Sequence, residues 1–343
     1  MTEALTGLVL LLSLSFLRIP IAFSMVAVGF GGMAWILGPQ GAMANVGQTA
    51  FDAAINYELS VVPLFVLMGN FVTRARLSSE LYTASNAFLG HRKGGLAMAT
   101  IVACGGFSAI CGSSLATAAT MAKVAMPSMR RFGYDDSLAA GSIAAGGTLG
   151  ILIPPSVLLV IYGILTQTSI GKLFAAGIMP GLVGILFYLA AVKAVIMIKP
   201  SAGPAGERQN WAQRMQALSR VWGVLLLFGI VMGGIYGGVF SPTEAAGIGA
   251  FGGFLFALFR KALNWYTFYE VLLESAATTA MLFAVLIGAL LFANFINVTD
   301  FPQALLEMAG QFSDTPWLVI AAILVIYVAL GCVFESLSMI LLT

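Results

Sequence analysis

Two short polar motifs inside apolar sequence hold the residues best suited to chemistry. Gly112, Ser113 and Ser114 interrupt one apolar stretch, and the segment Gly146–Ser156, with adjacent prolines, interrupts another. Both offer hydroxyl oxygens and backbone groups that a broken helix leaves unpaired. Free carbonyls bind cations and free N–H groups bind carboxylates. The motifs therefore predict a site for a cation beside an anionic solute.

The composition is that of a polytopic helical membrane protein. Hydrophobic residues make up 60% of the 343 residues and charged residues 9%, with a mean hydropathy of +0.98. The net charge of +2 argues against a nucleic-acid partner. No phosphate-binding loop with a Gly-Lys-Ser/Thr ending occurs, so ATP is not expected to drive the protein. Gly247–Gly252 fits a dinucleotide fingerprint but lies inside an apolar helix without a preceding strand, which favours helix packing.

Apolar segments divide the chain into candidate membrane helices. They are Ala4–Leu17, Ile21–Leu37, Leu59–Val72, Leu138–Leu165, Leu173–Ile198, Val221–Val239, Ala245–Phe259, Ser275–Ile296 and Trp317–Thr343. Gly94–Met126 differs because it is rich in small residues and hydroxyls and is flanked by basic residues at both ends. This pattern predicts a re-entrant helical hairpin with its tip near Cys111–Ser114. The alternative is one polar spanning helix packed through small residues.

The second motif predicts a helix broken at membrane depth. Pro154 and Pro155 lack backbone donors and disfavour helical geometry at Ile153. Non-helical backbone in a membrane is tolerated only where it is buried in protein or lines a polar cavity. Broken helices near the midplane are typical of the ion and solute sites of transporters.

Charge placement predicts the orientation of the chain. When the first segment starts outside, nearly all Lys and Arg residues fall in inner loops, while Asp52, Glu58, Asp300, Glu307 and Asp314 fall in outer loops. The longest inner connection, Lys199–Arg220, places Trp211, Met215 and Leu218 at helical spacing. We interpret it as a short helix in the headgroup plane, with a solvated loop as the alternative.

An internal repeat indicates two related halves. Leu67–Val72 resembles Leu291–Ile296, Phe30–Gly32 resembles Phe251–Gly253, and Ser114-Leu115 matches Ser336-Leu337, at offsets of 221 to 224 positions. Chance matching in a small alphabet is the alternative. We therefore expect residues 1–198 to form a first inverted repeat, with a hairpin at about 94–127 and a broken helix at about 138–165. Residues 199–220 connect it to an incomplete second repeat, 221–343, that ends in a second hairpin.

The counterpart of Pro154 in the second repeat would lie beyond Thr343. The sequence is therefore expected to be a C-terminally truncated or partial transporter that cannot transport by itself.

The motifs together resemble a known family. Gly105–Thr120, Gly150–Ser156 and Phe240–Ala246 are similar to the large membrane subunit of tripartite ATP-independent periplasmic (TRAP) transporters. The resemblance implies an all-α, inverted-repeat, elevator-type protein of the bacterial inner membrane that is a sodium symporter and not an enzyme. It further implies an organic acid such as a C4-dicarboxylate, sialic acid or keto acid, a periplasmic solute-binding protein, a small membrane subunit, and no cofactor apart from Na⁺ as coupling ion. Glu335 stands where the family often has Asp.

We expect a sodium site between the hairpin tip and the break. Its predicted residues are Gly112, Ser113, Ser114, Gly147, Thr148, Pro154 and Ser156. The expected solute cavity is lined or braced by Asn70, Thr117, Pro155, Glu335 and Ser336. The alternatives are that the Ser113 and Ser114 hydroxyls bond to their own helix and that the Glu335 carboxylate reaches water.

Two other functions stay open. A stand-alone sodium/dicarboxylate symporter of related fold is the first alternative. A membrane enzyme or respiratory-complex subunit is the weaker one, because the sequence offers no His, Cys or carboxylate cluster at catalytic spacing.

Overall fold

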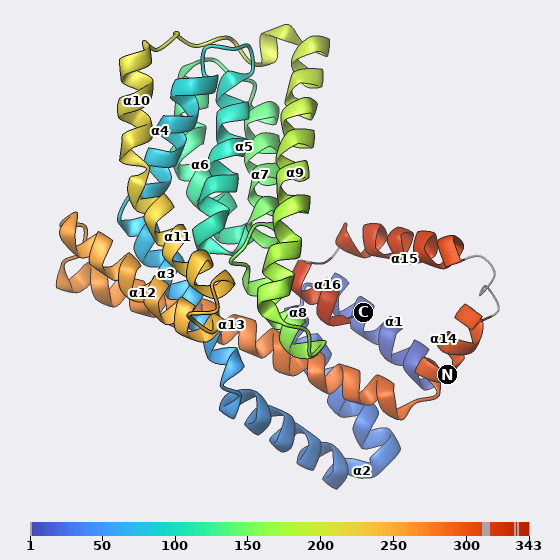
Figure 1. Ribbon diagram of the computed structural model, residues 1–343. Coiled ribbons are helices and arrows are strands. Elements are labelled where there is room, and N and C mark those ends of the chain that lie inside the picture. The colour runs from blue at the N-terminus through green and yellow to red at the C-terminus, as the bar shows by residue number, and fades with distance from the viewer. Residues whose placement is uncertain (1, 311–315, 333, 335, 343) are drawn as a thin grey trace. The chain divides into compact units, whose positions relative to one another are not determined.

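Helices form all the regular structure of the residues that are described. The computed structural model covers residues 2–310, 316–332, 334 and 336–342 (Figure 1). In that part of the chain four helices are long and apolar enough to cross a membrane, and three bent helix pairs bring the number of candidate spans to as many as seven. The all-α polytopic class is confirmed.

The chain packs into two compact units. Residues 1–56 and 278–343 form the first unit, and residues 57–277 form the second. The first contains α1 (Thr2–Phe16), α2 (Ile21–Ile55), the later part of α13 (Trp265–Val298), α14 (Phe301–Gly310), α15 (Pro316–Gly331) and α16 (Ser336–Leu342). Helix α2 bends at Gly38, which has a φ of 82° and precedes Pro39.

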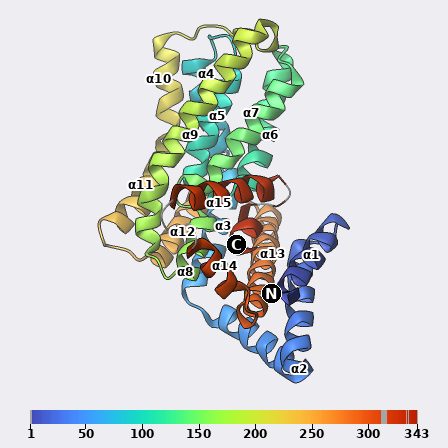
Figure 2. The ribbon, with the colours of Figure 1, turned by 90° about the vertical axis from the view of Figure 1, so that its right-hand side faces the viewer.

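The second unit contains the hairpin and the broken helix. Its helices are α3 (Val61–Arg74), α4 (Leu77–Leu89), α5 (Gly95–Cys111), α6 (Ser114–Arg131), α7 (Asp136–Leu152), α8 (Val157–Leu165), α9 (Ile170–Ile198), α10 (Trp211–Arg220), α11 (Trp222–Tyr236), α12 (Pro242–Phe259) and the start of α13. Helices α5, α6 and α7 lie side by side in both ribbon views (Figures 1 and 2). Helix α5 is buried along most of its length. It forms the core of this unit.

Most of the predicted helices are present, with three differences. Helix α4 was not predicted, because Ser78, Ser79 and Glu80 interrupt its apolar residues. Helices α2 and α13 extend well beyond the apolar segments that predicted them. The short helix of the inner connection is confirmed as α10, whereas its position in the headgroup plane stays a prediction.

The repeated motifs make equivalent contacts in the two units. In the first unit a Cβ on Gly32 of α2 would lie 2.3 Å from the Phe295 ring of α13. In the second unit a Cβ on Gly253 of α12 would lie 3.3 Å from Phe71 Cβ of α3. Gly253 follows Gly32 by 221 positions and Phe295 follows Phe71 by 224. In each unit a glycine of one helix thus lies against a phenylalanine of another, while the repeat itself, with its proposed boundaries, stays a prediction.

The inner connection is bound to the base of the hairpin. Gly94 N–H donates to Gly203 O at 2.8 Å, and Asp135 N–H donates to Ala202 O at 2.9 Å. Lys199 forms an ion pair with Asp135 and, together with Ser137, holds the pKa of that carboxyl far below its usual range. The carboxylate therefore keeps its charge, and with it this contact, down to strongly acidic pH.

Tyr134 completes the hairpin base and yields a stability prediction. Its hydroxyl accepts a hydrogen bond from Leu96 N–H at 3.1 Å, and this amide in the first turn of α5 has no helical acceptor. Both residues are buried. Tyr134→Phe leaves the amide unpaired and is expected to cost about 1–3 kcal/mol. The measurement is thermal unfolding in detergent, with Tyr236→Phe as control, since the Tyr236 hydroxyl has no hydrogen-bond partner among the described residues. Equal melting temperatures for the two variants would contradict the assignment.

Candidate functional site

The hairpin reverses direction over two residues. Gly112 ends α5 with a φ of 64°, a left-handed conformation that glycine adopts without strain. Ser113 is extended and caps α6, where its hydroxyl accepts from Ala116 N–H at 3.4 Å. The predicted tip between residues 111 and 114 is thereby confirmed.

The proline motif breaks the next membrane segment as predicted. Helix α7 ends at Leu152, helix α8 begins at Val157, and the two axes differ by 40°. Ser156 stabilises both ends of the break. Its hydroxyl donates to Ile151 O at 2.8 Å and accepts from Leu159 N–H at 3.4 Å. Pro154 and Pro155 are buried within the break.

The tip and the break meet through their backbones. Val157 N–H donates to Gly112 O at 3.2 Å. A Cβ on Gly112 would lie 2.5 Å from Pro155 O, and one on Gly150 would lie 2.6 Å from Ser113 O. A Cβ on Gly147 would likewise lie 2.7 Å from Ala118 Cβ and 3.2 Å from Ser114 O, both on α6. We call this contact, formed by residues 112–114, 147, 150 and 153–157, the tip–break junction.

Four helix ends converge at the tip–break junction. Helices α5 and α7 end there, which presents carbonyl groups and the negative ends of two helix dipoles. Helices α6 and α8 begin there, which presents N–H groups and the positive ends of two dipoles. The junction can thus bind a cation and a carboxylate side by side without a charged side chain.

Hydroxyl groups at the tip–break junction differ in their availability. Ser113 and Ser156 act as helix caps. The hydroxyl of Ser114 is half-buried and has no hydrogen-bond partner among the described residues, so it is free to bind an ion. Thr148 is exposed, and its hydroxyl contacts Ala145 O and Tyr188 OH at 2.7 Å each. The Thr148 hydroxyl is therefore bound to α7 and α9 and not to the tip, and the rest of the predicted ion-binding set stays a prediction.

The predicted cavity residues are less closely grouped. Asn70 on α3 donates to Ser275 Oγ on α13 at 2.8 Å, a bracing contact. Thr117 is buried in α6, and its hydroxyl has no hydrogen-bond partner among the described residues. Ser336 begins α16, which belongs to the other unit. Glu335 lies outside the described residues.

Sequence reasoning missed two glycines that position the tip–break junction. Gly150 lies against the backbone of Ser113, and a Cβ on Gly69 of α3 would lie 3.2 Å from the Cys111 sulfur. Gly147 and Gly150 lie three positions apart on α7, a spacing that places both on one helix face. That spacing could have identified the glycine face of α7 from the sequence. The described residues contain no group of His, Cys, Asp or Glu side chains that could hold a metal ion.

Comparison with known proteins gives one consistent family. Residues 8–343 match the family model described as tripartite ATP-independent periplasmic transporter, DctM component. The C4-dicarboxylate TRAP transporter large permease protein DctM of Pseudomonas aeruginosa is 35% identical over 91% of this chain and 73% of its own length. The sialic acid permease SiaM of Vibrio cholerae is 32% identical over 96% and 77%, and the ectoine permease TeaC of Halomonas elongata is 33% identical over 94% and 75%.

The close glycine contact at the tip–break junction can be tested by adding one methyl group. Gly150→Ala forces a Cβ against the backbone of Ser113 and Ser114 and is expected to lower stability by about 1–3 kcal/mol. Gly141→Ala is the matched control on α7, because its Cβ would meet no atom within 4 Å and should stabilise the helix by up to about 1 kcal/mol. Thermal unfolding of both variants in detergent gives the comparison. Similar shifts for the two would refute the close approach.

Proposed function

Because the chain belongs to the DctM family of TRAP transporters, we propose that it is a large permease subunit that carries a small organic acid across the membrane together with Na⁺. Its relatives are transporter permeases, so it is a multi-pass membrane transporter and not an enzyme. The observation that carries the proposal is the tip–break junction, where four helix ends meet around uncharged oxygens.

Sodium suits the chemistry of the tip–break junction. Carbonyl and hydroxyl oxygens are uncharged and can bind a monovalent cation. A divalent metal site, by contrast, usually includes negatively charged carboxylates. The ends of α5 and α7 supply the carbonyls, and Ser114 supplies an uncommitted hydroxyl. We propose that Na⁺ binds there, with Ser113 and Ser156 fixing the helix starts and Thr148 outside the coordination shell.

The solute is proposed to bind through a carboxylate. Named relatives handle C4-dicarboxylates, sialic acid and ectoine, and each of these solutes carries a carboxylate. At the N-terminal ends of α6 and α8, the N–H groups that do not already donate to Gly112 O, Ser113 Oγ or Ser156 Oγ can bind such an anion beside the proposed Na⁺ site. A neighbouring Na⁺ strengthens carboxylate binding by Coulomb attraction, which couples the two ligands.

The proposal includes the two partners that a tripartite system implies. They are a periplasmic solute-binding protein and a small membrane subunit, and one relative is an isethionate TRAP transporter permease protein with the joint name DctMQ. Acidic residues in the predicted outer loops, among them Asp52, Glu58 and Asp300, offer negative charge to a binding protein with a basic face.

Sodium coupling predicts how uptake responds to ions and to one hydroxyl. In proteoliposomes that also contain the partner subunit and binding protein, uptake should require an inward Na⁺ gradient and should fail with K⁺. Ser114→Ala should raise the Na⁺ concentration for half-maximal uptake about three- to tenfold, as expected for one lost ligand. Ser13→Ala, which removes a hydroxyl bonded within α1, should leave that concentration unchanged. Equal uptake in Na⁺ and K⁺ would exclude sodium as the coupling ion.

Dependence on a binding protein separates this proposal from a stand-alone sodium/dicarboxylate symporter. Uptake should saturate with the solute-loaded binding protein and should stop when it is omitted. High ionic strength should weaken the association of that protein with the permease, because complementary charges guide the encounter and salt screens them. Saturable uptake of free solute at the same rate without any binding protein would favour the stand-alone symporter.

A further inference from the structure

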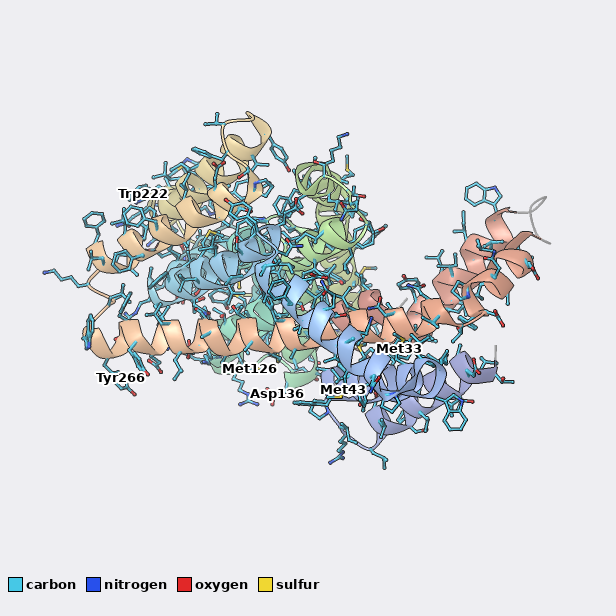
Figure 3. The ribbon with its side chains drawn as sticks, turned by 90° about the horizontal axis from the view of Figure 1, so that it is seen from below. Met33, Met43, Met126, Asp136, Trp222 and Tyr266 are labelled. Carbon is cyan, nitrogen blue, oxygen red and sulfur yellow. The ribbon has the colours of Figure 1, made fainter. Side chains whose placement is uncertain are left out.

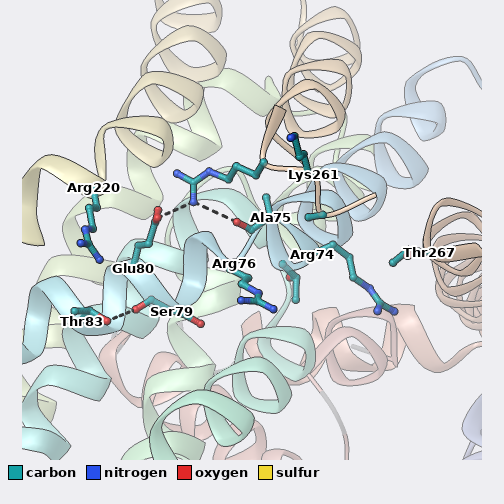
Figure 4. A pocket seen from close by; sticks show the side chains of 12 residues that line it. Arg74, Ala75, Arg76, Ser79, Glu80, Thr83, Arg220, Lys261 and Thr267 are labelled. Atoms are coloured by element: carbon teal, nitrogen blue, oxygen red, sulfur yellow. Dashed lines mark hydrogen bonds and ion pairs between the residues drawn. The ribbon is translucent and has the colours of Figure 1, made fainter. Parts of the chain in front are cut away.

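A basic cavity lies in the 57–277 unit, remote in sequence from the tip–break junction. It has a volume of about 810 Å³ and lies where the α3–α4 turn, the end of α10 and the α12–α13 turn come together (Figure 4). Its charged lining residues are Arg74, Arg76, Glu80, Arg220, Arg260 and Lys261. Five cations thus face one carboxylate. The sequence places these residues on the inner side of the membrane.

Two of the five cations are neutralised within the protein. Arg260 binds Glu80 at 2.7 Å and also donates to Ala75 O at 3.3 Å. Arg74 pairs with Glu270 and Glu274 of α13 at 3.1 and 3.2 Å. The side chains of the other three, Arg76, Arg220 and Lys261, have no ion pair or hydrogen bond among the described residues. Three uncompensated positive charges around one cavity favour an anionic ligand.

The backbone holds two of these three cations in a costly conformation. Arg76 has a φ of 61° and Lys261 a φ of 54°, and each stands just past the end of a helix. The left-handed conformation is unfavourable for a residue with a side chain, and glycine usually takes such positions. Strained positions cluster at ligand sites, where the surroundings maintain them. The same conformation also occurs just past α1 at Arg18 and just past α8 at Gln167, so it fixes the positions of Arg76 and Lys261 but does not by itself indicate a ligand.

Exposed aromatic residues place the cavity at the depth of the lipid headgroups. Trp222 follows Arg220 by two positions and is 56% exposed, while Trp265 and Tyr266 follow Lys261 and are 84% and 76% exposed. Trp222 and Tyr266 are labelled in Figure 3 on α11 and α13. Exposed Trp and Tyr residues mark the membrane interface. Farther along the same helices Leu225 and Leu226 on α11 and Leu273 on α13 are exposed, the last beside the exposed Glu274 that pairs with Arg74.

We propose that this cavity binds the phosphate group of an anionic membrane lipid of the inner leaflet, with phosphatidylglycerol as the probe. Arg76, Arg220 and Lys261 contact the phosphate, since their charges are uncompensated. Arg260 stays bound to Glu80 and keeps the α3–α4 and α12–α13 turns together. A lipid fits better than a free phosphate because the neighbouring apolar surface of α11 and α13 can receive acyl chains. The site is independent of the proposed transport function.

The test is lipid retention by the solubilised full chain in native mass spectrometry. The protein is mixed with equimolar phosphatidylglycerol and phosphatidylcholine of identical acyl chains, and the wild type should retain phosphatidylglycerol preferentially. Arg76→Gln/Arg220→Gln/Lys261→Gln should weaken this binding about tenfold or more. The control Arg92→Gln/Lys93→Gln/Arg208→Gln also removes two arginines and one lysine, but these lie outside the cavity. It should therefore bind the lipid like the wild type.

Two outcomes would overturn the proposal. Equal phosphatidylglycerol retention by the cavity and control variants would show that the cavity does not bind the lipid. Displacement of the lipid by equimolar inorganic phosphate would show that the cavity binds a free anion. A lipid site should keep its lipid under these conditions. If the triple variant fails to fold, Arg220→Gln replaces it, because this exposed side chain makes no contact that folding requires. A wild type without preference between the two lipids would also refute the proposal.

Discussion

The architecture of this transporter depends on satisfying backbone hydrogen bonds where helices are interrupted inside a membrane. Each unpaired N–H or C=O in hydrocarbon costs several kcal/mol, and two consecutive prolines remove two donors. The break between α7 and α8 is stable because the Ser156 hydroxyl hydrogen-bonds to both ends and Val157 N–H donates to Gly112 O in the hairpin tip. The hairpin and the broken helix therefore complete each other, and neither would be satisfied alone.

This dependence explains why glycine and backbone, rather than charged side chains, form the tip–break junction. The tip approaches α7 so closely that a single methyl group on Gly150 would overlap the backbone of Ser113. The proposed site, made of helix ends, would recognise a carboxylate and a small cation but encode little about the rest of the solute. Relatives with about one third identity that differ in their named solutes are consistent with such a general site.

The features that could be predicted from sequence were those with a local physical cause. Pro154 and Pro155 required a break, and Gly112 with Ser113 required a tight reversal, so both were located to within a few residues. Helix α4 escaped prediction because its serines and Glu80 interrupt the apolar pattern, although one carboxylate oxygen of Glu80 accepts a hydrogen bond from Arg260, 180 positions away. Such long-range pairing leaves no local signal. The orientation of Thr148 was predictable in principle, since it lies about 100° around α7 from Gly147, which faces the tip.

The proposed Na⁺ site lies where the hairpin tip meets the broken helix. The most direct measurement is hydrogen–deuterium exchange of the permease in lipid nanodiscs, compared in Na⁺ and K⁺ at equal ionic strength. A bound ion restrains the residues that coordinate it, so local opening becomes rarer. We expect Na⁺ to slow exchange in peptides covering residues 112–118 and 150–159, with little change in α9 or α11. Identical exchange in the two salts at the tip and the break would contradict the proposed site.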